Sequence, residues 1–279
     1  MNYSAVILAA GKGVRMHSQI PKVLHRVAGK PMIWYVVKAV EEAGINDITL
    51  VVGHGREIVE ETLSGETLRF VVQEQQLGTG HALMQAQGSI NSANTLVVLS
   101  GDTPLLEGNT LKKLLDFHQQ QQALATVLSG LLPDPYGYGR IIRQADGGLE
   151  RIIEEKDASP EEKEITEINT GMYCFQAGAV FAALSQIECS NAQGEYYLTD
   201  VLPILKKDGH KVAVLATDKI DQIHGINDRV QMAQAETIIR QRHNQKLMKN
   251  GVTIMAPETT FIDSSVKIGM DTVVYPFTI

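Results

Sequence analysis

The sequence predicts an α/β fold around a mixed, mostly parallel sheet, because two features recur along the chain. Short apolar runs alternate with longer amphipathic segments, in the order strand, helix, strand. Runs such as 48–52 and 95–99 contain only apolar or β-branched residues, which is typical of strands covered on both faces. This order favours parallel strands joined by right-handed crossovers. Ligands are then expected beyond the carboxyl ends of the strands.

The first half of the chain carries most of this alternation. The expected elements, in order, are 5–10 (strand), 32–44 (helix), 47–53 (strand), 56–65 (helix), 68–73 (strand), 81–90 (helix), 94–102 (strand) and 109–122 (helix).

After about residue 130 the pattern changes. Segment 137–154, "GYGRIIRQADGGLERIIE", predicts a hairpin with a Gly-Gly turn, and 168–184 a strand followed by a helix. Another strand is expected at 210–218. Segment 228–250 has a long helical pattern that ends at Gly251, with cations in its last turns. We interpret this helix as a connector with a solvated face.

The last segment, 251–279, has a six-residue period. Ile262, Ile268 and Val274 recur at that spacing, as in the hexapeptide repeats of a parallel β-helix. Such coils need at least three repeats to bury a core, and this chain ends with the third. We therefore expect a longer natural protein, with boundaries at 1–227, 228–250 and 251–279.

The bulk composition excludes several classes of protein. The chain has 279 residues, 44% of them hydrophobic, and a net charge of −7, which argues against a broad nucleic-acid surface. Two cysteines, Cys174 and Cys189, give neither a disulfide framework nor metal-ligand spacing. The sequence shows no signal peptide and no apolar run of membrane-spanning length. We expect a reduced, cytoplasmic protein that does not bind membranes.

The stretch "LAAGKGVRM", 8–16, is the first candidate site. Its small residues let the backbone approach an anion, and Lys12 and Arg15 can hold phosphate charge. It matches neither a Walker A loop nor the dinucleotide fingerprint. Lys22 follows in "PKVLH", where Pro21 stiffens its approach to the same place. The alternatives are a tight turn and a surface lysine.

The stretch "QEQQLGTGHA", 73–82, suits a nucleobase. Gln73 and Gln76 offer amide groups, and Gly78 and Gly80 let a base lie against the backbone beside Thr79. The alternative is a helix-capping turn with Thr79 at the cap.

Asp102 and Asn227 are the candidate metal ligands. Asp102 follows the most apolar strand, in "LSGDTP", where a carboxylate suits Mg²⁺ beside phosphates. Asn227 stands in "GIND" at the start of the long helix. The alternative for each is a helix cap.

Four further segments suit a sugar: "GYGR" at 137–140, "IIEEKDA" at 152–158, "EINTG" at 167–171 and "EYYLTD" at 195–200. Glu154 and Asn169 can bind hydroxyl or N-acetyl groups by hydrogen bonds. His54, His81 and His118 have no recognisable partners at a useful spacing and receive no catalytic role.

Together these motifs, in this order, resemble the N-terminal uridyltransferase part of the bacterial GlmU family, over essentially the whole chain. That family is bifunctional, joining N-acetylglucosamine-1-phosphate uridyltransferase and glucosamine-1-phosphate N-acetyltransferase activities. The resemblance implies a Rossmann-like nucleotidyltransferase domain. It further implies an Mg²⁺-dependent reaction of UTP with N-acetylglucosamine 1-phosphate that gives UDP-N-acetylglucosamine and pyrophosphate for the synthesis of cell-wall precursors. It also implies a left-handed β-helix and a homotrimer for the full-length protein, and leaves the oligomeric state of this chain open. The acetyltransferase segments do not occur in this sequence.

The resemblance also implies a role for individual residues. Arg15 and Lys22 would be catalytic, and Asp102 and Asn227 would hold the metal. The implied nucleotide-binding residues are Leu8, Ala9, Ala10, Gly11, Gly13, Lys22, Gln73, Gln76, Gly78 and Thr79. The implied sugar-binding residues are Gly139, Glu154, Asn169, Tyr197, Thr199 and Asn227.

Two positions depart from the family pattern. Val14 stands where threonine is usual, and Ser100 where an aromatic residue can occur. Two other functions stay open. One is the same chemistry with another sugar phosphate or another base. The other is a non-catalytic sensor of sugar nucleotides, against which the set of Arg15, Lys22 and the two metal candidates argues.

Overall fold

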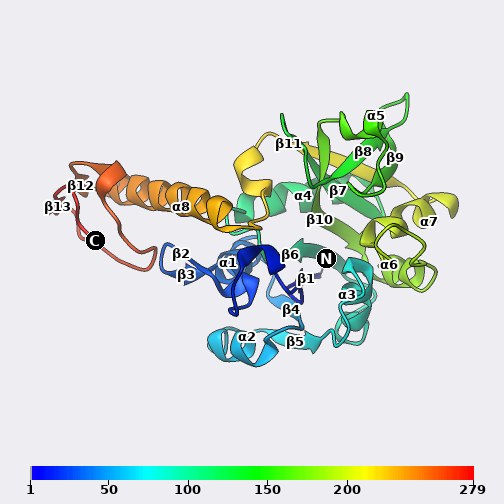
Figure 1. Cartoon of the computed structure of the whole chain (residues 1–279), viewed down its shortest axis with the longest axis horizontal. Helices are drawn as coiled ribbons and strands as arrows, with labels where there is room; N and C mark the ends of the chain where they lie inside the picture. Colours follow the sequence, from blue (N-terminus) through cyan, green and yellow to red (C-terminus); the bar gives the residue numbers. More distant parts are fainter. Residues whose placement is uncertain (1) are drawn as a thin grey trace.

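A nine-stranded mixed sheet forms the centre of the molecule (Figure 1). The computed structural model describes residues 2–279. Seven strands form the main path of the sheet, in the order β11 (Val212–Thr217), β7 (Ala125–Leu131), β10 (Glu167–Gln176), β6 (Thr95–Ser100), β1 (Tyr3–Leu8), β4 (Asp47–Val52) and β5 (Arg69–Val72). All of them run in one direction except β10, which pairs antiparallel with β6 and β7. The expected mixed, mostly parallel sheet is confirmed.

Helices cover both faces of this sheet, as the apolar strands require. One face packs against α1 (Met32–Glu42), α2 (Arg56–Thr62) and α4 (Gly108–Gln121). The other packs against α3 (Thr79–Gln85), α6 (Ala177–Leu184) and α7 (Val201–Lys207). Cys174 of β10 lies in the first of these cores, and Cys189 is exposed.

The predicted hairpin extends the sheet from β10. Strand β8 (Gly139–Arg143) pairs with β9 (Leu149–Ile153) and with the first part of β10, at Ile168 and Asn169. The register of β10 against β7 shifts between Asn169 and Tyr173. A short helix, α5 (Pro160–Lys163), joins β9 to β10. Because β10 runs opposite to its neighbours, its first residues lie at the edge where the parallel strands end.

The long helix α8 (Arg229–Lys249) leads away from this body, as Figure 1 shows. Its buried side chains include Ala235 and Ile239, which pack on Val27 and Met32. Helix α8 thus buries one face and keeps exposed residues such as Gln234 and Gln241, as expected for a connector with a solvated face.

The C-terminal segment forms a small lobe at the far end of α8 (Figure 1). Its strands β12 (Thr253–Ile254) and β13 (Val273–Val274) pair in parallel. The three side chains of the six-residue period, Ile262, Ile268 and Val274, share one apolar cluster with Leu247. This arrangement suits the predicted repeat, but residues 251–279 do not by themselves show a β-helix.

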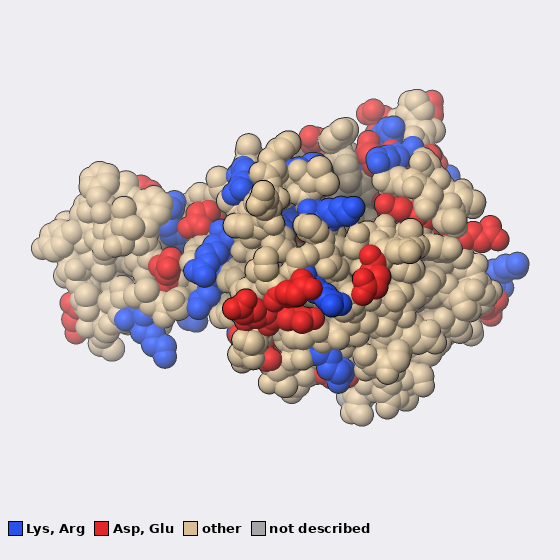
Figure 2. All heavy atoms as spheres, turned by 60° about the horizontal axis from the view of Figure 1, so that its bottom comes forward, with Lys and Arg blue, Asp and Glu red and all other residues tan. Residues whose placement is uncertain are grey.

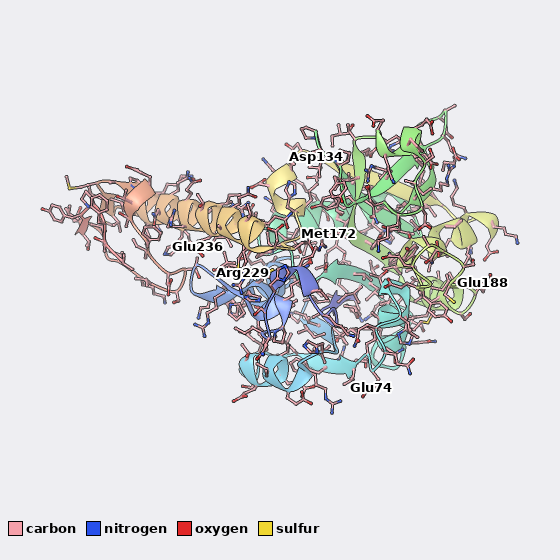
Figure 3. The ribbon with its side chains drawn as sticks, viewed as in Figure 1. Glu74, Asp134, Met172, Glu188, Arg229 and Glu236 are labelled. Atoms are coloured by element: carbon pink, nitrogen blue, oxygen red, sulfur yellow. The ribbon has the colours of Figure 1, made fainter. Side chains whose placement is uncertain are left out.

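A short hairpin that was not predicted from the sequence connects the body around the sheet with α8 and the C-terminal lobe. Strands β2 (Arg26–Val27) and β3 (Lys30–Pro31) flank a turn in which Ala28 has a φ of +44°. The Ala28 N–H donates to Glu236 of α8 at 2.5 Å, and Figure 3 shows Glu236 on the side of α8 near this hairpin. The Ala28 carbonyl accepts from Ser264 of the C-terminal lobe at 3.2 Å.

Charged side chains of both signs are interspersed on the face drawn in Figure 2, and no large basic area gathers there. None of the helices within residues 2–279 combines the length and the apolar character needed to cross a membrane.

Candidate active site

Two adjoining cavities lie at the carboxyl ends of the parallel strands, where the fold predicts a ligand. The first, about 260 Å³, is lined by the loop after β1 and by the segment from β5 to α3. The second, about 250 Å³, is lined by β8, β10 and the segment before α7. Both are bordered by Leu8, Thr79, Ser100 and Asp102. The two cavities therefore meet beside Asp102.

The loop after β1 forms the floor of the first cavity. Leu8, Ala9, Ala10 and Gly11 line it, and a side chain at Gly11 would meet nothing within 4 Å. Gly13 has a φ of +59°, and a Cβ there would stand 2.5 Å from the Cβ of Lys22. Glycine at 13 thus permits both the turn and the close approach of Lys22.

Lys22, Asp102 and Asn227 form a cluster at the junction. The Lys22 ammonium forms an ion pair with the Asp102 carboxylate and donates to Asn227 Oδ1 at 2.7 Å. The side chain of Lys22 is 13% exposed and that of Asp102 is 17% exposed. Ser100 donates to the other oxygen of Asp102 at 2.7 Å. Lys22 is therefore a site residue rather than a surface lysine.

The helix-cap alternatives for the two candidate metal ligands are wrong. Helix α4 begins at Gly108, six residues after Asp102, and its N-cap is Glu107. Helix α8 is capped by Asp228, whose side chain accepts from the backbone of Gln231 at 2.8 Å. Neither side chain caps a helix, and both offer an oxygen to the Lys22 ammonium instead.

The same two oxygens suit Mg²⁺. A carboxylate and an amide oxygen are both hard ligands of the kind this ion prefers, and it usually takes only one or two carboxylates beside phosphates. The Lys22 ammonium lies between them and shows that one positive charge is accommodated at this point. Among residues 2–279 no group of three or more His, Cys, Asp or Glu side chains could hold a metal alone. The remaining ligands of a Mg²⁺ held by these two oxygens would come from substrate phosphates or from water.

The far end of the first cavity is built from the segment between β5 and α3. Gln73, Gln76, Gly78 and Thr79 all line it. Gly78 has a φ of +107°, and a Cβ there would stand 2.6 Å from the Tyr196 carbonyl oxygen. Gly78, not Thr79, is the N-cap of α3, and the Thr79 hydroxyl accepts from the Leu198 N–H at 3.1 Å. The capping alternative for Thr79 is therefore wrong.

The second cavity collects most of the predicted sugar residues. Gly139, Glu154, Asn169, Thr199 and Asn227 line it. Thr199 donates to Glu154 at 3.4 Å, and burial raises the pKa of Glu154. Asn169 donates to the Tyr173 hydroxyl at 2.7 Å, which fixes its amide.

Three predicted residues, Gly13, Arg15 and Tyr197, line neither cavity. Tyr197 is buried and accepts from Gln193 at 2.8 Å, but it borders neither cavity. Arg15 is exposed on a 3₁₀ turn, Val14–Met16, and makes no hydrogen bond within residues 2–279. Burial raises the pKa of the Tyr138 hydroxyl, and the positive charge of Arg15 offsets part of that rise, so Arg15 lies within electrostatic reach of a residue that lines the second cavity.

Several lining residues were not singled out from the sequence. Tyr138 and Thr103 line the second cavity, and Glu195 lines the first. All three stand inside motifs described above: Tyr138 in "GYGR", Thr103 in "LSGDTP" and Glu195 in "EYYLTD". Only their individual roles were not predicted. Ser100 was noted as a departure, and its hydrogen bond to Asp102 gives it a function.

Comparison with known proteins agrees with this geometry. Residues 5–158 match the model of the MobA-like NTP transferase domain. The chain is 58% identical over 279 residues to the bifunctional protein GlmU of Syntrophomonas wolfei, covering all of this chain and 62% of that protein. It is 50% identical over 279 residues to the GlmU of Pelotomaculum thermopropionicum, covering 61% of that protein. The chain thus spans about three-fifths of these relatives, and the resemblance drawn from the sequence is confirmed.

A solved structure shares the fold. A protein from Bacillus anthracis, assigned as a glucose-1-phosphate thymidylyltransferase and crystallised with sucrose, matches with a TM-score of 0.69 and 23% identity. The match covers 85% of this chain and 95% of the other. The family match extends from β1 through the two glutamines and Asp102 to the hairpin that carries Glu154, and so includes most of the cavity walls. The chain belongs to the MobA-like NTP transferase domain family.

Proposed function

We propose that the chain transfers a uridylyl group from UTP to N-acetylglucosamine 1-phosphate, giving UDP-N-acetylglucosamine and pyrophosphate. One observation carries the proposal: two cavities of unlike lining meet at a single charged cluster of Lys22, Asp102 and Asn227. The first cavity suits a nucleotide and the second a sugar. Relatives named GlmU support the choice of substrates.

The chemistry needs charge and position rather than a general base. An oxygen of the sugar phosphate attacks the α-phosphorus of UTP, a new P–O bond forms, and the bond to the β-phosphate breaks to release pyrophosphate. A phosphate dianion is already a nucleophile, so no proton must be removed. The catalytic residues hold the two reactants in line and offset their negative charge.

Each residue has a distinct task in this proposal. Lys22 leaves its present partners to contact the transferred phosphoryl group, and Arg15 reaches over the triphosphate from its exposed turn. Asp102 and Asn227 would hold Mg²⁺, and the ion would supply positive charge that offsets the charge of the phosphates. Gln73, Gln76, Gly78 and Thr79 bind the base, and the loop 8–13 lies along the phosphates.

The sugar lies in the second cavity. Glu154, Asn169, Thr199 and the backbone at Gly139 contact its hydroxyl and N-acetyl groups, and Tyr197 supports this wall from behind. The division into a transferase domain (1–227), a linker helix (228–250) and the first coils of a left-handed β-helix (251–279) completes the proposal. The longer protein would be a cytoplasmic homotrimer that also carries acetyl transfer in its remaining part.

A substrate panel tests this assignment. Pyrophosphate release is measured with UTP, dTTP or CTP, each against N-acetylglucosamine 1-phosphate or glucose 1-phosphate, in Mg²⁺ and again in EDTA. We expect release with UTP and N-acetylglucosamine 1-phosphate that EDTA abolishes. Preference for dTTP or glucose 1-phosphate would reassign the substrates within the same chemistry. Tight binding of UDP-N-acetylglucosamine with no turnover would instead indicate a sensor.

A further inference from the structure

The Gln73 side chain is held in one orientation by two neighbours. Its amide nitrogen Nε2 donates to the Gly78 carbonyl oxygen at 3.1 Å and lies 3.0 Å from Nδ1 of His81. An amide nitrogen can only donate, and a backbone carbonyl can only accept. Turning the amide over would place its oxygen against the Gly78 oxygen. The Gly78 contact therefore fixes which end of the amide points inward.

That orientation decides the tautomer of His81. With the amide in this orientation Nδ1 accepts from Gln73, which places the ring N–H on Nε2. The amide nitrogen of Gln85 lies 3.2 Å from Nε2 and donates to the His81 carbonyl oxygen at 3.2 Å. With the ring proton on Nε2, the contact between Gln85 and Nε2 brings two donors together and is not a hydrogen bond, so the carbonyl oxygen is the acceptor for Gln85. Gln85 therefore has a partner that does not compete for Nδ1.

The other end of Gln73 is free. Its Oε1 atom accepts no hydrogen bond within residues 2–279, and it is not among the solvent-inaccessible polar atoms that lack a partner. Gln73 itself is 3% exposed and lines the first cavity. A carbonyl acceptor without a partner among the described residues thus stands at the wall of the first cavity, and Gln73 also borders a hollow beside Gly53 and His54.

We propose that His81 is a positioning residue for base selection: it holds the Gln73 amide so that Gln73 offers an acceptor, not a donor, to the base. This inference rests on the proposed function. An acceptor at this point pairs with the N3–H of uracil and opposes the unprotonated N3 of cytosine. With both amide hydrogens engaged, Gln73 cannot adapt to cytosine by turning over, since that would leave the His81 and Gly78 acceptors unpaired.

Two substitutions separate the acceptor from the bulk of the ring. His81→Leu keeps an apolar side chain of similar reach and removes the acceptor. His81→Asn places an amide oxygen near the position of Nδ1 and restores it. Gln85→Ala is the matched control, because it changes the neighbour of the other ring nitrogen only. Binding of UTP and of CTP in Mg²⁺ is measured by calorimetry for each, with thermal melting to verify folding.

We expect the preference for UTP over CTP to fall roughly tenfold to a hundredfold in His81→Leu. It should stay within about threefold of the wild type in His81→Asn and Gln85→Ala, which keep both acceptors. In turnover, the KM for UTP should rise in His81→Leu while the KM for N-acetylglucosamine 1-phosphate stays constant. A ring that only fills space would move both KM values or neither.

The inference is overturned if folded His81→Leu keeps the wild-type preference, or if His81→Asn loses it as fully as His81→Leu. A wild-type protein that binds UTP no better than CTP would overturn it together with the proposed substrate. A wild-type preference for UTP that His81→Leu leaves intact would overturn the role of His81 alone.

Discussion

We expect His118 to make a large contribution to the loss of stability in acid. This residue borders neither of the two cavities. His118 lies on α4, is 6% exposed, and its Nδ1 is 2.8 Å from the Thr126 hydroxyl of β7. Burial lowers its pKa from 6.5 to about 4. Between these two values the unfolded chain binds a proton that the folded chain does not. Stability is therefore complete above about pH 6.5 and is lost as the pH falls toward 4.

The size of this effect follows from the same two values. A pKa lowered from 6.5 to about 4 corresponds to about 3 kcal/mol once the pH lies below both. At pH 5 the loss should be about 2 kcal/mol before solvent screening, which lowers it toward roughly 1 kcal/mol.

Urea unfolding between pH 7.5 and 4.5 measures this loss. The wild type is compared with His118→Asn, which retains a polar atom near Thr126 and does not titrate. The variant should be less stable at pH 7.5 by an amount that shrinks as the pH falls, because the wild type alone carries the penalty. Parallel pH dependence of the two proteins would refute the argument, since other groups titrate equally in both.

Three further predictions concern the site and its support. Gly78→Ala should raise the KM for UTP more than that for the sugar phosphate, because its φ of +107° and the Tyr196 oxygen 2.6 Å away exclude a Cβ; equal effects on both would count against the placement of the base. Glu236→Ala should lower the free energy of unfolding by about 1–2 kcal/mol, because the Ala28 N–H then loses its acceptor. Glu236→Gln should be intermediate in the same urea denaturation series. An unchanged midpoint of denaturation in Glu236→Ala would show that the hairpin needs no support from α8. In the native protein a thiol reagent should modify only the exposed Cys189, because Cys174 is buried and its thiol pKa is raised by burial; rapid modification of two thiols, counted by absorbance, would contradict this.

Much of the site could be predicted because it follows strand ends. Apolar runs located β1 and β6, and the residues directly after them, Gly11 and Asp102, necessarily meet at one edge of a parallel sheet. Lys22 could be proposed from local sequence, but its partners lie 80 and 205 residues away. Only the fold could show that Asn227 belongs to the same cluster rather than to a helix cap.

Other features had no local signal. The β2–β3 hairpin has two-residue strands, and its turn contains Ala28 with a positive φ, which is unusual outside glycine. It is held by contacts with Glu236 and Ser264 that sequence spacing cannot reveal. The role proposed for His81 likewise depends on the folded position of Gln73, which lies six residues before the start of α3.

The central claim is that the charged cluster between the two cavities carries out metal-dependent nucleotidyl transfer. The most direct test is pyrophosphate release from UTP and N-acetylglucosamine 1-phosphate in Mg²⁺, with wild type beside Asp102→Ala. Glu188→Ala is the control, since that carboxylate, labelled in Figure 3, is exposed and borders neither cavity. Asp102→Ala should lose on the order of a hundredfold or more in rate while Glu188→Ala keeps the wild-type rate. Near-native turnover by a folded Asp102→Ala protein would contradict the account.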